Sequence, residues 1–177
     1  FNSGGTSAPD GIIIGTESKW AEELLMKIYE PFHLPIVSVN RRSAEMIKYA
    51  SNAFLATKVS FINEIATLCE RVGADGQTVA KGMGLDQGIG SKFLHAGPGF
   101  GGSCFPKDLA ALVQMGEKAG YPMQIAGAAA TVNAEQRVRM VDKIRDALGG
   151  LEGTTVGFLG LSFKPNTNDL REAPALS

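Results

Sequence analysis

The sequence predicts a mainly α-helical central domain flanked by two truncated α/β pieces of the Rossmann-like kind. Apolar residues recur at steps of three and four through the middle of the chain, whereas short β-branched runs occur near each end. A parallel sheet needs several strand–helix units, and neither end supplies them. We therefore expect α/β pieces at 9–40 and 151–177 and a helical domain at 41–150. Residues 1–8, rich in Gly and Ser, are expected to be a disordered tail or an expression remnant.

The first piece has the pattern strand, helix, strand. A short apolar run between Gly11 and Gly15 is rich in isoleucine and predicts a buried strand. Ser18 is a plausible cap for a helix whose apolar positions keep helical spacing up to Pro31. Pro35 to Val39 predicts a second strand.

The middle of the chain begins with an unusually long helical pattern. Apolar residues keep helical spacing from Ser43 to Val72, no proline interrupts them, and Gly73 follows. The pattern predicts one helix of about 30 residues, on the order of 45 Å long. A helix of this length usually lies along a partner helix or bridges two domains. A shorter helix from Asp75 to Met83, capped by Asp75, is predicted next.

Two further helices and a strand are expected in the remaining sequence. Proline at a first helical position predicts a helix from Pro106 to Lys118, and an alanine-rich stretch predicts another from Met123 to Leu148. Within the latter, Asn133 followed by Gln136 resembles a capping box, which would place a break there. Thr154 to Phe163 reads TTVGFLGLSF and predicts a buried strand.

The charge balance, the hydrophobicity and the cysteine content exclude several classes of function. Seventeen Lys and Arg stand against eighteen Asp and Glu, so neither nucleic-acid binding nor an acidic tail is indicated. No apolar run approaches the roughly 20 residues that cross a bilayer, so we expect no membrane association. The two cysteines, Cys69 and Cys104, are too few for a disulfide framework and favour a reducing cytoplasm.

The candidate chemistry lies in a glycine-rich segment before the Pro106 helix. The run GPGFGGSCFPKD begins at Gly97, and its glycines permit a backbone nest that could bind an anion. It is not a Walker A loop, because Ser and Cys follow its last glycine. Cys104 precedes a predicted helix whose partial positive charge favours a thiolate, and Lys107 adds a cation. These features suit a nucleophilic cysteine; the alternative is a tight turn that packs an inert thiol.

Three collinear stretches resemble the nucleotide-sugar 6-dehydrogenases, the family of the UDP-glucose and GDP-mannose dehydrogenases. They read AEMIKYASNAFLATKVSFINEIA, SKFLHAGPGFGGSCFPKD and GLSFKPNTNDLREAP. The resemblance implies a central domain like the C-terminal domain of 6-phosphogluconate dehydrogenase, which forms a homodimer through its helices. Residues 9–40 would then end an NAD-binding domain, and residues 151–177 would begin a UDP-binding domain.

The resemblance also implies a reaction and a set of catalytic residues. Family members oxidise a sugar primary alcohol to a carboxylate in two hydride transfers to NAD, and the motifs favour UDP-glucose as substrate. Cys104 would form a thiohemiacetal and then a thioester with C6 of the sugar. Lys48 and Asn52, four residues apart on one helical face, would stabilise the developing oxyanion. Asp108 would position water and orient the lysine.

Substrate and cofactor contacts are carried over in the same way. Arg171 matches an arginine near the NAD phosphates, and no metal is predicted. The expected contacts with the UDP-sugar come from side chains and from the backbone of the glycine loop: Phe93, Leu94, Gly97, Gly99, Phe100, Gly101, Gly102, Lys107 and Lys164.

The sequence departs from the family pattern at two places, and three alternative functions stay open. Residues 2–8 lack the family's acid–base glutamate, and Gly88 stands where many members carry an arginine that reaches the partner subunit's substrate. We expect the chain alone to be nearly inactive, as a fragment of a larger enzyme. The alternatives are a purely structural dimer scaffold, a GDP-mannose or UDP-N-acetylhexosamine dehydrogenase of the same family, and, remotely, a cysteine hydrolase, for which a histidine partner is missing.

Overall fold

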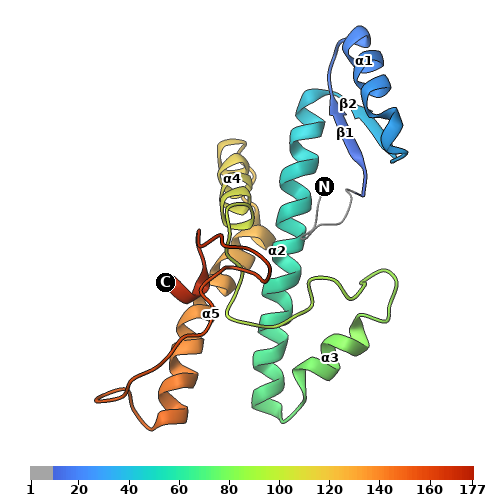
Figure 1. The fold of residues 1–177 in the computed structure, drawn as a ribbon. Helices are drawn as coiled ribbons and strands as arrows, with labels where there is room; N and C mark the ends of the chain where they lie inside the picture. The colour runs from blue at the N-terminus through green and yellow to red at the C-terminus, as the bar shows by residue number, and fades with distance from the viewer. Residues whose placement is uncertain (1–9) are drawn as a thin grey trace. The chain divides into compact units, whose positions relative to one another are not determined.

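The computed structural model describes residues 10–177, so the expected tail at 1–8 lies outside the described residues. The chain divides after Ser51 into two compact units. Five α-helices and one two-stranded sheet account for most of the regular structure of the described residues (Figure 1). The predicted mainly helical architecture is confirmed.

The first unit contains a strand–helix–strand motif. Strand β1 (Ile12–Gly15) leads into α1 (Lys19–Tyr29), the short 3-10 helix η1 (Glu30–Phe32) and β2 (Ile36–Val39). The strands pair in parallel with Ile12 opposite Ile36, because the helix carries the chain back to the same end of the sheet. The predicted cap is confirmed: the Ser18 hydroxyl oxygen accepts a hydrogen bond from Ala21 N–H.

Tight packing joins β1 to the first turns of the following helix. A Cβ at Gly15 would lie 2.6 Å from the Ala44 Cβ, so only glycine fits there. Among the described residues of this unit Ile14 is buried, whereas Trp20 and Phe32 are exposed. A parallel strand pair with one helix leaves much of its apolar surface uncovered.

Helix α2 (Arg41–Val72) is continuous, as the sequence predicts. It begins after Asn40, whose side-chain oxygen accepts a hydrogen bond from Ser43 N–H at 2.8 Å. In the second unit the helix buries mainly small and polar side chains, several of which are three or four residues apart: Asn52, Ala53, Ala56, Ser60, Ile62, Asn63 and Cys69.

Helix α3 (Gly76–Met83) has the predicted cap. Asp75 accepts hydrogen bonds from the Thr78 hydroxyl at 2.6 Å and from Gln77 N–H at 3.0 Å, and these bonds lower the pKa of its carboxyl. An exposed turn follows, in which Gly88 N–H donates to Asp86 Oδ1.

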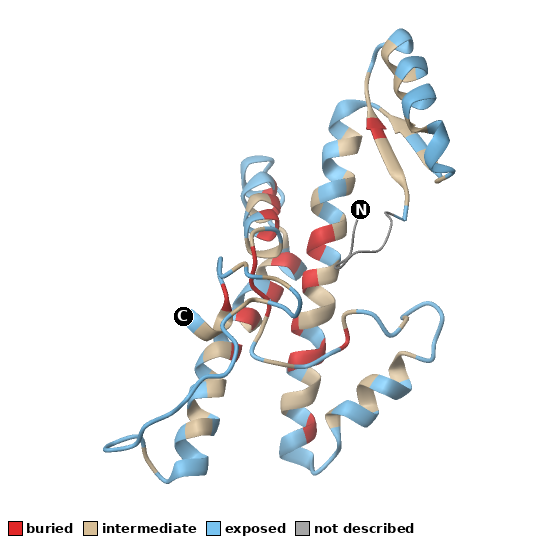
Figure 2. Ribbon diagram, viewed as in Figure 1, coloured by how far each residue is buried: buried red, intermediate tan, exposed pale blue. Residues whose placement is uncertain are grey.

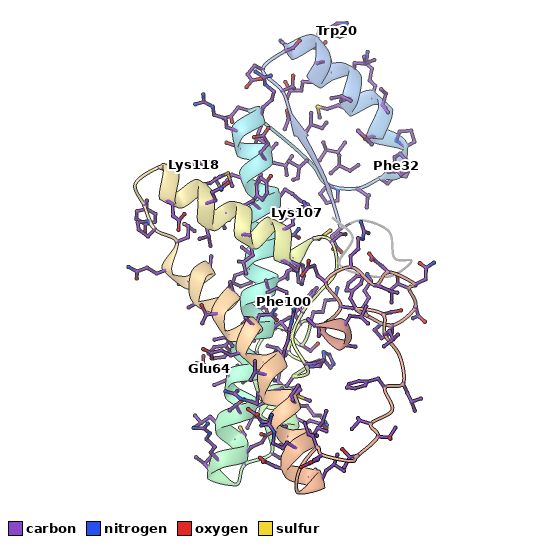
Figure 3. The ribbon with its side chains drawn as sticks, turned by 90° about the vertical axis from the view of Figure 1, so that its left-hand side faces the viewer. Trp20, Phe32, Glu64, Phe100, Lys107 and Lys118 are labelled. Atoms are coloured by element: carbon purple, nitrogen blue, oxygen red, sulfur yellow. The ribbon has the colours of Figure 1, made fainter. Side chains whose placement is uncertain are left out.

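Helices α4 (Phe105–Lys118) and α5 (Gln124–Leu148) pack against each other, and Lys107 and Lys118 mark the two ends of α4 (Figure 3). The Ser60 hydroxyl donates to the Ala129 carbonyl at 2.7 Å and ties α2 to α5. The predicted break at Asn133 is wrong, because α5 runs through it. Asn133 and Gln136 are buried and bind another segment instead of capping a helix.

The predicted strand from Thr154 to Phe163 is also wrong. The segment has no ladder partner among the described residues, and Phe158 and Leu159 are exposed. A β-rich sequence forms a strand only where a neighbouring strand takes up its hydrogen bonds. The chain then folds back and ends near the 3-10 helix η2 (Pro174–Leu176).

The core of the second unit lies where α2, α4 and α5 meet, and Figure 2 shows its buried positions on these helices and on the segments between them. Leu109, Leu112, Ala126 and Ala129 supply much of its apolar content. None of the helices in the described part of the chain has the length and apolarity that a membrane crossing requires.

Candidate active site at the start of helix α4

Cys104 occupies the cap position of α4 and is exposed. Its side chain makes no capping hydrogen bond, and the Ser103 hydroxyl lies 3.8 Å from the sulfur. Pro106 sits in the first turn, as predicted. Cys69, by contrast, is buried. The exposed sulfur at a helix N-terminus suits a nucleophile and does not fit the packed, inert thiol.

A buried polar pair lies one turn into α4. Asp108 is almost fully buried, and its Oδ2 accepts a 2.5 Å hydrogen bond from the Asn52 amide on α2. The Lys107 ammonium lies 2.5 Å from Oδ1 of the same carboxylate. Because a buried carboxylate without partners is costly, these contacts explain how Asp108 can lie inside the fold.

The backbone connects this pair to the cysteine. Asp108 N–H donates to the Cys104 carbonyl at 2.8 Å, which closes the first turn of α4. The structure therefore brings together three of the predicted catalytic residues. Cys104 and Asp108 lie on the same turn of α4, and the Asn52 amide is hydrogen-bonded to the Asp108 carboxylate. Lys48, exposed, lies four residues before Asn52 on α2, as its spacing predicts.

The glycine loop that precedes Cys104 is held by the protein itself. Gly97 N–H donates to Asn63 Oδ1 at 2.8 Å, Phe100 N–H to Asn133 Oδ1 at 2.7 Å, and Gly102 N–H to the Arg171 carbonyl at 2.9 Å. All three N–H groups are used inside the fold, so an anion nest in this loop would have to use its other backbone N–H groups.

Close approach explains three of the loop's glycines. A Cβ at Gly99 would lie 2.7 Å from Asn133 Oδ1, and Gly99 has a φ of +106°. A Cβ at Gly101 would lie 2.0 Å from the Glu172 carbonyl oxygen, and one at Gly102 would meet the Phe163 ring at 2.6 Å. The C-terminal segment therefore rests directly on the loop.

Aromatic side chains of the loop pack on Phe105, the residue after the cysteine. The Phe105 ring lies edge-on to Phe100, with centroids 5.8 Å apart, and 6.0 Å from Phe93. Phe100 is buried, and Figure 3 locates it in the middle of the second unit. Leu94 is buried as well. Phe93 and Leu94 thus belong partly to the core, although Phe93 is only half-buried and has a positive φ of 66°.

The C-terminal segment contributes two cations. The Arg171 guanidinium binds Asp169 through Nε at 2.9 Å and Nη2 at 2.7 Å, and the pair lowers the pKa of the Asp169 carboxyl to about 2. The negative Asp169 in turn raises the pKa of Arg171. Lys164 lies over the Phe163 ring, 5.3 Å from its centroid.

Three residues that build this site were not predicted from the sequence. Asn63 on α2, and Asn133 and Gln136 on α5, are buried amides whose side chains bind the glycine loop. A signal was present: amides at i and i+3 on the alanine face of a helix lower helix propensity without a capping role. We assigned that signal to a break in the helix.

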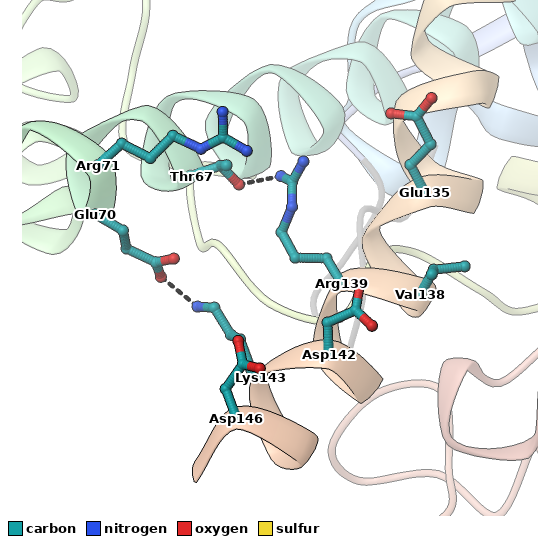
Figure 4. A pocket seen from close by; sticks show the side chains of 9 residues that line it. All are labelled: Thr67, Glu70, Arg71, Glu135, Val138, Arg139, Asp142, Lys143 and Asp146. Atoms are coloured by element: carbon teal, nitrogen blue, oxygen red, sulfur yellow. Dashed lines mark hydrogen bonds and ion pairs between the residues drawn. The ribbon is translucent and has the colours of Figure 1, made fainter. Parts of the chain in front are cut away.

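An open hollow lies elsewhere, between α2 and α5 (Figure 4). Lys143 pairs with Glu70 across it, and Arg139 donates to the Thr67 hydroxyl. It contains none of the predicted site residues, and its paired charges join the two helices. Among residues 10–177 no group of His, Cys, Asp or Glu could hold a metal ion.

Comparison with known proteins agrees with this geometry. The profile of the central domain of the UDP-glucose/GDP-mannose dehydrogenase family matches residues 42–135, more than half of the chain. The chain belongs to the UDP-glucose/GDP-mannose dehydrogenase family. The residues that match contain Asn52, Cys104 and Asp108, so the polar pair and the cysteine lie within the family's central domain.

Individual relatives support this family assignment over most of the chain. UDP-glucose 6-dehydrogenase TuaD of Bacillus subtilis is 57% identical over 93% of the chain and 36% of its own length. UDP-glucose 6-dehydrogenase of Rhizobium meliloti is 50% identical over 96% of the chain and 40% of its own length. The structure of a UDP-glucose dehydrogenase from Pyrobaculum islandicum superimposes with a TM-score of 0.92 at 45% identity, covering 95% of the chain and 39% of that structure. The chain thus spans well under half the length of these family members.

Proposed function

We propose that the protein to which this chain belongs oxidises the C6 hydroxymethyl group of UDP-glucose to a carboxylate, with NAD as the electron acceptor. One observation carries the proposal: an exposed cysteine begins α4, one turn before a buried carboxylate that the Asn52 amide holds. Three relatives at 50% identity or more are named UDP-glucose 6-dehydrogenases, which supports UDP-glucose over other nucleotide sugars.

The sulfur chemistry follows from the properties of a thiol. The first oxidation removes a hydride from C6 and a proton from the C6 hydroxyl group, and gives an aldehyde. The Cys104 sulfur adds to the aldehyde carbon and forms a thiohemiacetal, from which a second hydride leaves to give a thioester. Water then cleaves the C–S bond, releases the carboxylate and restores the thiol.

Asn52, Lys48 and Asp108 would support these steps. Asn52 has two amide N–H groups, and one donates to Asp108. The other, together with the Lys48 ammonium one turn away, is suited to stabilise negative charge on the C6 oxygen. Asp108, held by Asn52 and Lys107, would orient the attacking water at the last step.

NAD would receive the hydride in both oxidations. Among the described residues, Arg171 is the one that we assign to NAD binding. Arg171, the residue matched to the NAD phosphates, is held bidentately by Asp169. We therefore assign to this chain the sulfur chemistry and the sugar contacts, with Arg171 at the margin of the dinucleotide. Robust NADH formation by the isolated chain would contradict this division.

The domain assignment is part of the same proposal. Residues 9–40 would complete an NAD-binding domain, residues 41–150 form the dimerising core, and residues 151–177 open a UDP-binding domain. The exposed Trp20 and Phe32 in the first unit, and the unpaired segment from Thr154 to Phe163, support it. Two free cysteines suit a cytoplasmic enzyme.

The substrate contacts remain as predicted, with one refinement. Lys107 and Lys164 are cations near the cysteine loop and are suited to the diphosphate or the sugar. The N–H groups of Gly97, Phe100 and Gly102 are already bonded, so loop contacts with the nucleotide would come from the other backbone groups of the loop.

Dimerisation is supported by a stripe of apolar side chains on α2. Phe54 and Phe61 are 66% and 46% exposed, and Leu68 and Val72 continue the same face at seven- and four-residue steps. An exposed apolar face of this kind is suited to burial against a second copy.

The proposal is tested by alkylation and turnover together. Iodoacetamide should modify Cys104 faster than the buried Cys69, and UDP-glucose should protect it. In the full-length protein, Cys104→Ser should abolish uronate formation, whereas Cys69→Ala should leave turnover largely unchanged. Equal, slow labelling of both cysteines, or full activity of Cys104→Ser, would overturn it.

A further inference from the structure

The buried amides Asn63, Asn133 and Gln136, here called the amide clamp, bind the glycine loop at two of its residues. Gly97 donates its N–H to Asn63 Oδ1 and accepts at its carbonyl from Gln136 Nε2, each at 2.8 Å. Phe100 donates to Asn133 Oδ1 at 2.7 Å and accepts from Asn133 Nδ2 at 3.1 Å. The clamp thus takes both backbone polar groups of both residues.

This arrangement fixes the loop more firmly than turn geometry alone. Asn133 pairs with Phe100 as a neighbouring strand would, using its amide in place of a peptide group. Gly99 permits the approach, since a side chain there would strike Asn133 Oδ1. All three clamp residues are buried, so each lost bond would leave a polar group unsatisfied.

The presence of Asn133 in α5 is not explained by helix stability. Asparagine is a weaker helix former than alanine, yet it occurs at position 133 in an otherwise alanine-rich stretch of α5. A residue that opposes its own local structure usually serves another requirement of the fold or of the site. Here the group it serves is the segment that ends in Cys104.

Contacts of the loop with residues next to Cys104 restrict the position of the cysteine. The Phe100 ring packs edge-on against Phe105, the residue after Cys104. Gly102, two residues before Cys104, is held from the other side by the Arg171 carbonyl. With the loop anchored at residues 97, 100 and 102, the start of α4 has little freedom to shift.

We infer that Asn133, assisted by Gln136 and Asn63, is a positioning residue that aligns the Cys104 sulfur for attack on the aldehyde carbon. This inference rests on the proposed function. Since the sulfur bonds to the substrate only after the first hydride has left, a loosened clamp impairs the second oxidation selectively. A displacement of about 1 Å costs on the order of 100-fold in such a step.

The test uses the full-length dehydrogenase with Asn133→Ala, and with Gln136→Met as a milder variant that keeps side-chain volume. Ser60→Ala is the matched control: it removes a buried hydrogen bond between the same two helices, to Ala129, without contacting the loop. The readouts are the kcat for directly added UDP-sugar 6-aldehyde, the rate of the first hydride transfer from UDP-glucose in a single turnover, and amide hydrogen exchange at Gly97 and Phe100.

For Asn133→Ala we expect aldehyde oxidation to fall roughly 10- to 100-fold, while the first hydride transfer changes less than about threefold. Exchange at Phe100 should accelerate about tenfold. Gln136→Met should show the same pattern more weakly, and Ser60→Ala should show neither change. Unaltered exchange would overturn the clamp, and an equal loss in both oxidations, or the same selective loss in Ser60→Ala, would overturn the positioning role. If the wild-type enzyme oxidises neither substrate, the proposed function fails, and the exchange data still decide whether the clamp holds the loop.

Discussion

The amide of Asn52 donates a 2.5 Å hydrogen bond to the carboxylate of Asp108, and both side chains are buried although 56 residues separate them in the sequence. The bond joins α2 to the first turn of α4. It couples the residue proposed to stabilise the oxyanion to the residue proposed to position water, so a change at either one acts on both.

Removing the Asn52 amide should destabilise the fold as well as the chemistry. Asn52→Ala leaves the buried Asp108 with one hydrogen-bond donor fewer, and we expect a loss of about 2 kcal/mol in the free energy of unfolding. Urea denaturation of the chain measures it. Asn168→Ala, at an exposed position, is the control and should cost less than about 0.5 kcal/mol. Equal effects would show that the bond contributes nothing specific.

The close contact of the loop with the C-terminal segment predicts a contrast between two glycines. Gly101→Ala puts a methyl group against the Glu172 carbonyl, whereas a Cβ at Gly97 meets nothing within 4 Å. We expect Gly101→Ala to release the segment around Ala173 and expose it to limited proteolysis. Gly97→Ala should leave the digestion pattern unchanged, and matching patterns for the two variants would refute the contact.

The Asp169–Arg171 pair predicts a specific pH dependence. The pKa of the Asp169 carboxyl is lowered from 3.8 to about 2, first by the Arg171 side chain and last by Lys164. A lowered pKa in the folded state means that the pair contributes stability above about pH 4, and that this contribution is lost as the pH falls toward 2.

An NMR titration of the Asp169 carboxyl measures this directly. Arg171→Gln should return the midpoint toward 3.8, while Lys164→Gln should shift it only slightly. A midpoint near 3.8 in the wild-type chain would mean that the pair does not persist in solution.

The apolar stripe on α2 predicts self-association. Sedimentation of the chain should show a species of twice its mass, and Phe61→Glu should convert it to monomer by placing a charge in the buried face. Val138→Glu, at an exposed position on α5, should leave the dimer intact. A wild-type monomer at micromolar concentration contradicts the prediction.

Local patterns in the sequence predicted what local interactions determine. The length of α2, the caps Ser18 and Asp75 and the position of Cys104 at the start of α4 all follow from residues within a few positions of one another. Such features depend on helix periodicity and on unsatisfied backbone groups at helix ends.

Interactions distant in the sequence could not be predicted in this way. Asn133 satisfies a backbone 33 residues away, so its pattern alone looked like a cap. The run from Thr154 to Phe163 has strand-forming residues but no neighbouring strand among the described residues, and β-propensity takes effect only in a sheet. The assignment of Lys48 and Arg171 came from the resemblance to the family, since an isolated cation carries no such signal.

The hydrogen bond from Gly102 to the Arg171 carbonyl has a bearing on biosynthesis. As the polypeptide leaves the ribosome, Cys104 emerges long before the residues that rest on its loop, because domains form from the N-terminus onward. Until Arg171 and Ala173 have also emerged, the thiol belongs to a nascent chain whose reactive loop is still unfinished, so residues translated well after the nucleophile complete its surroundings.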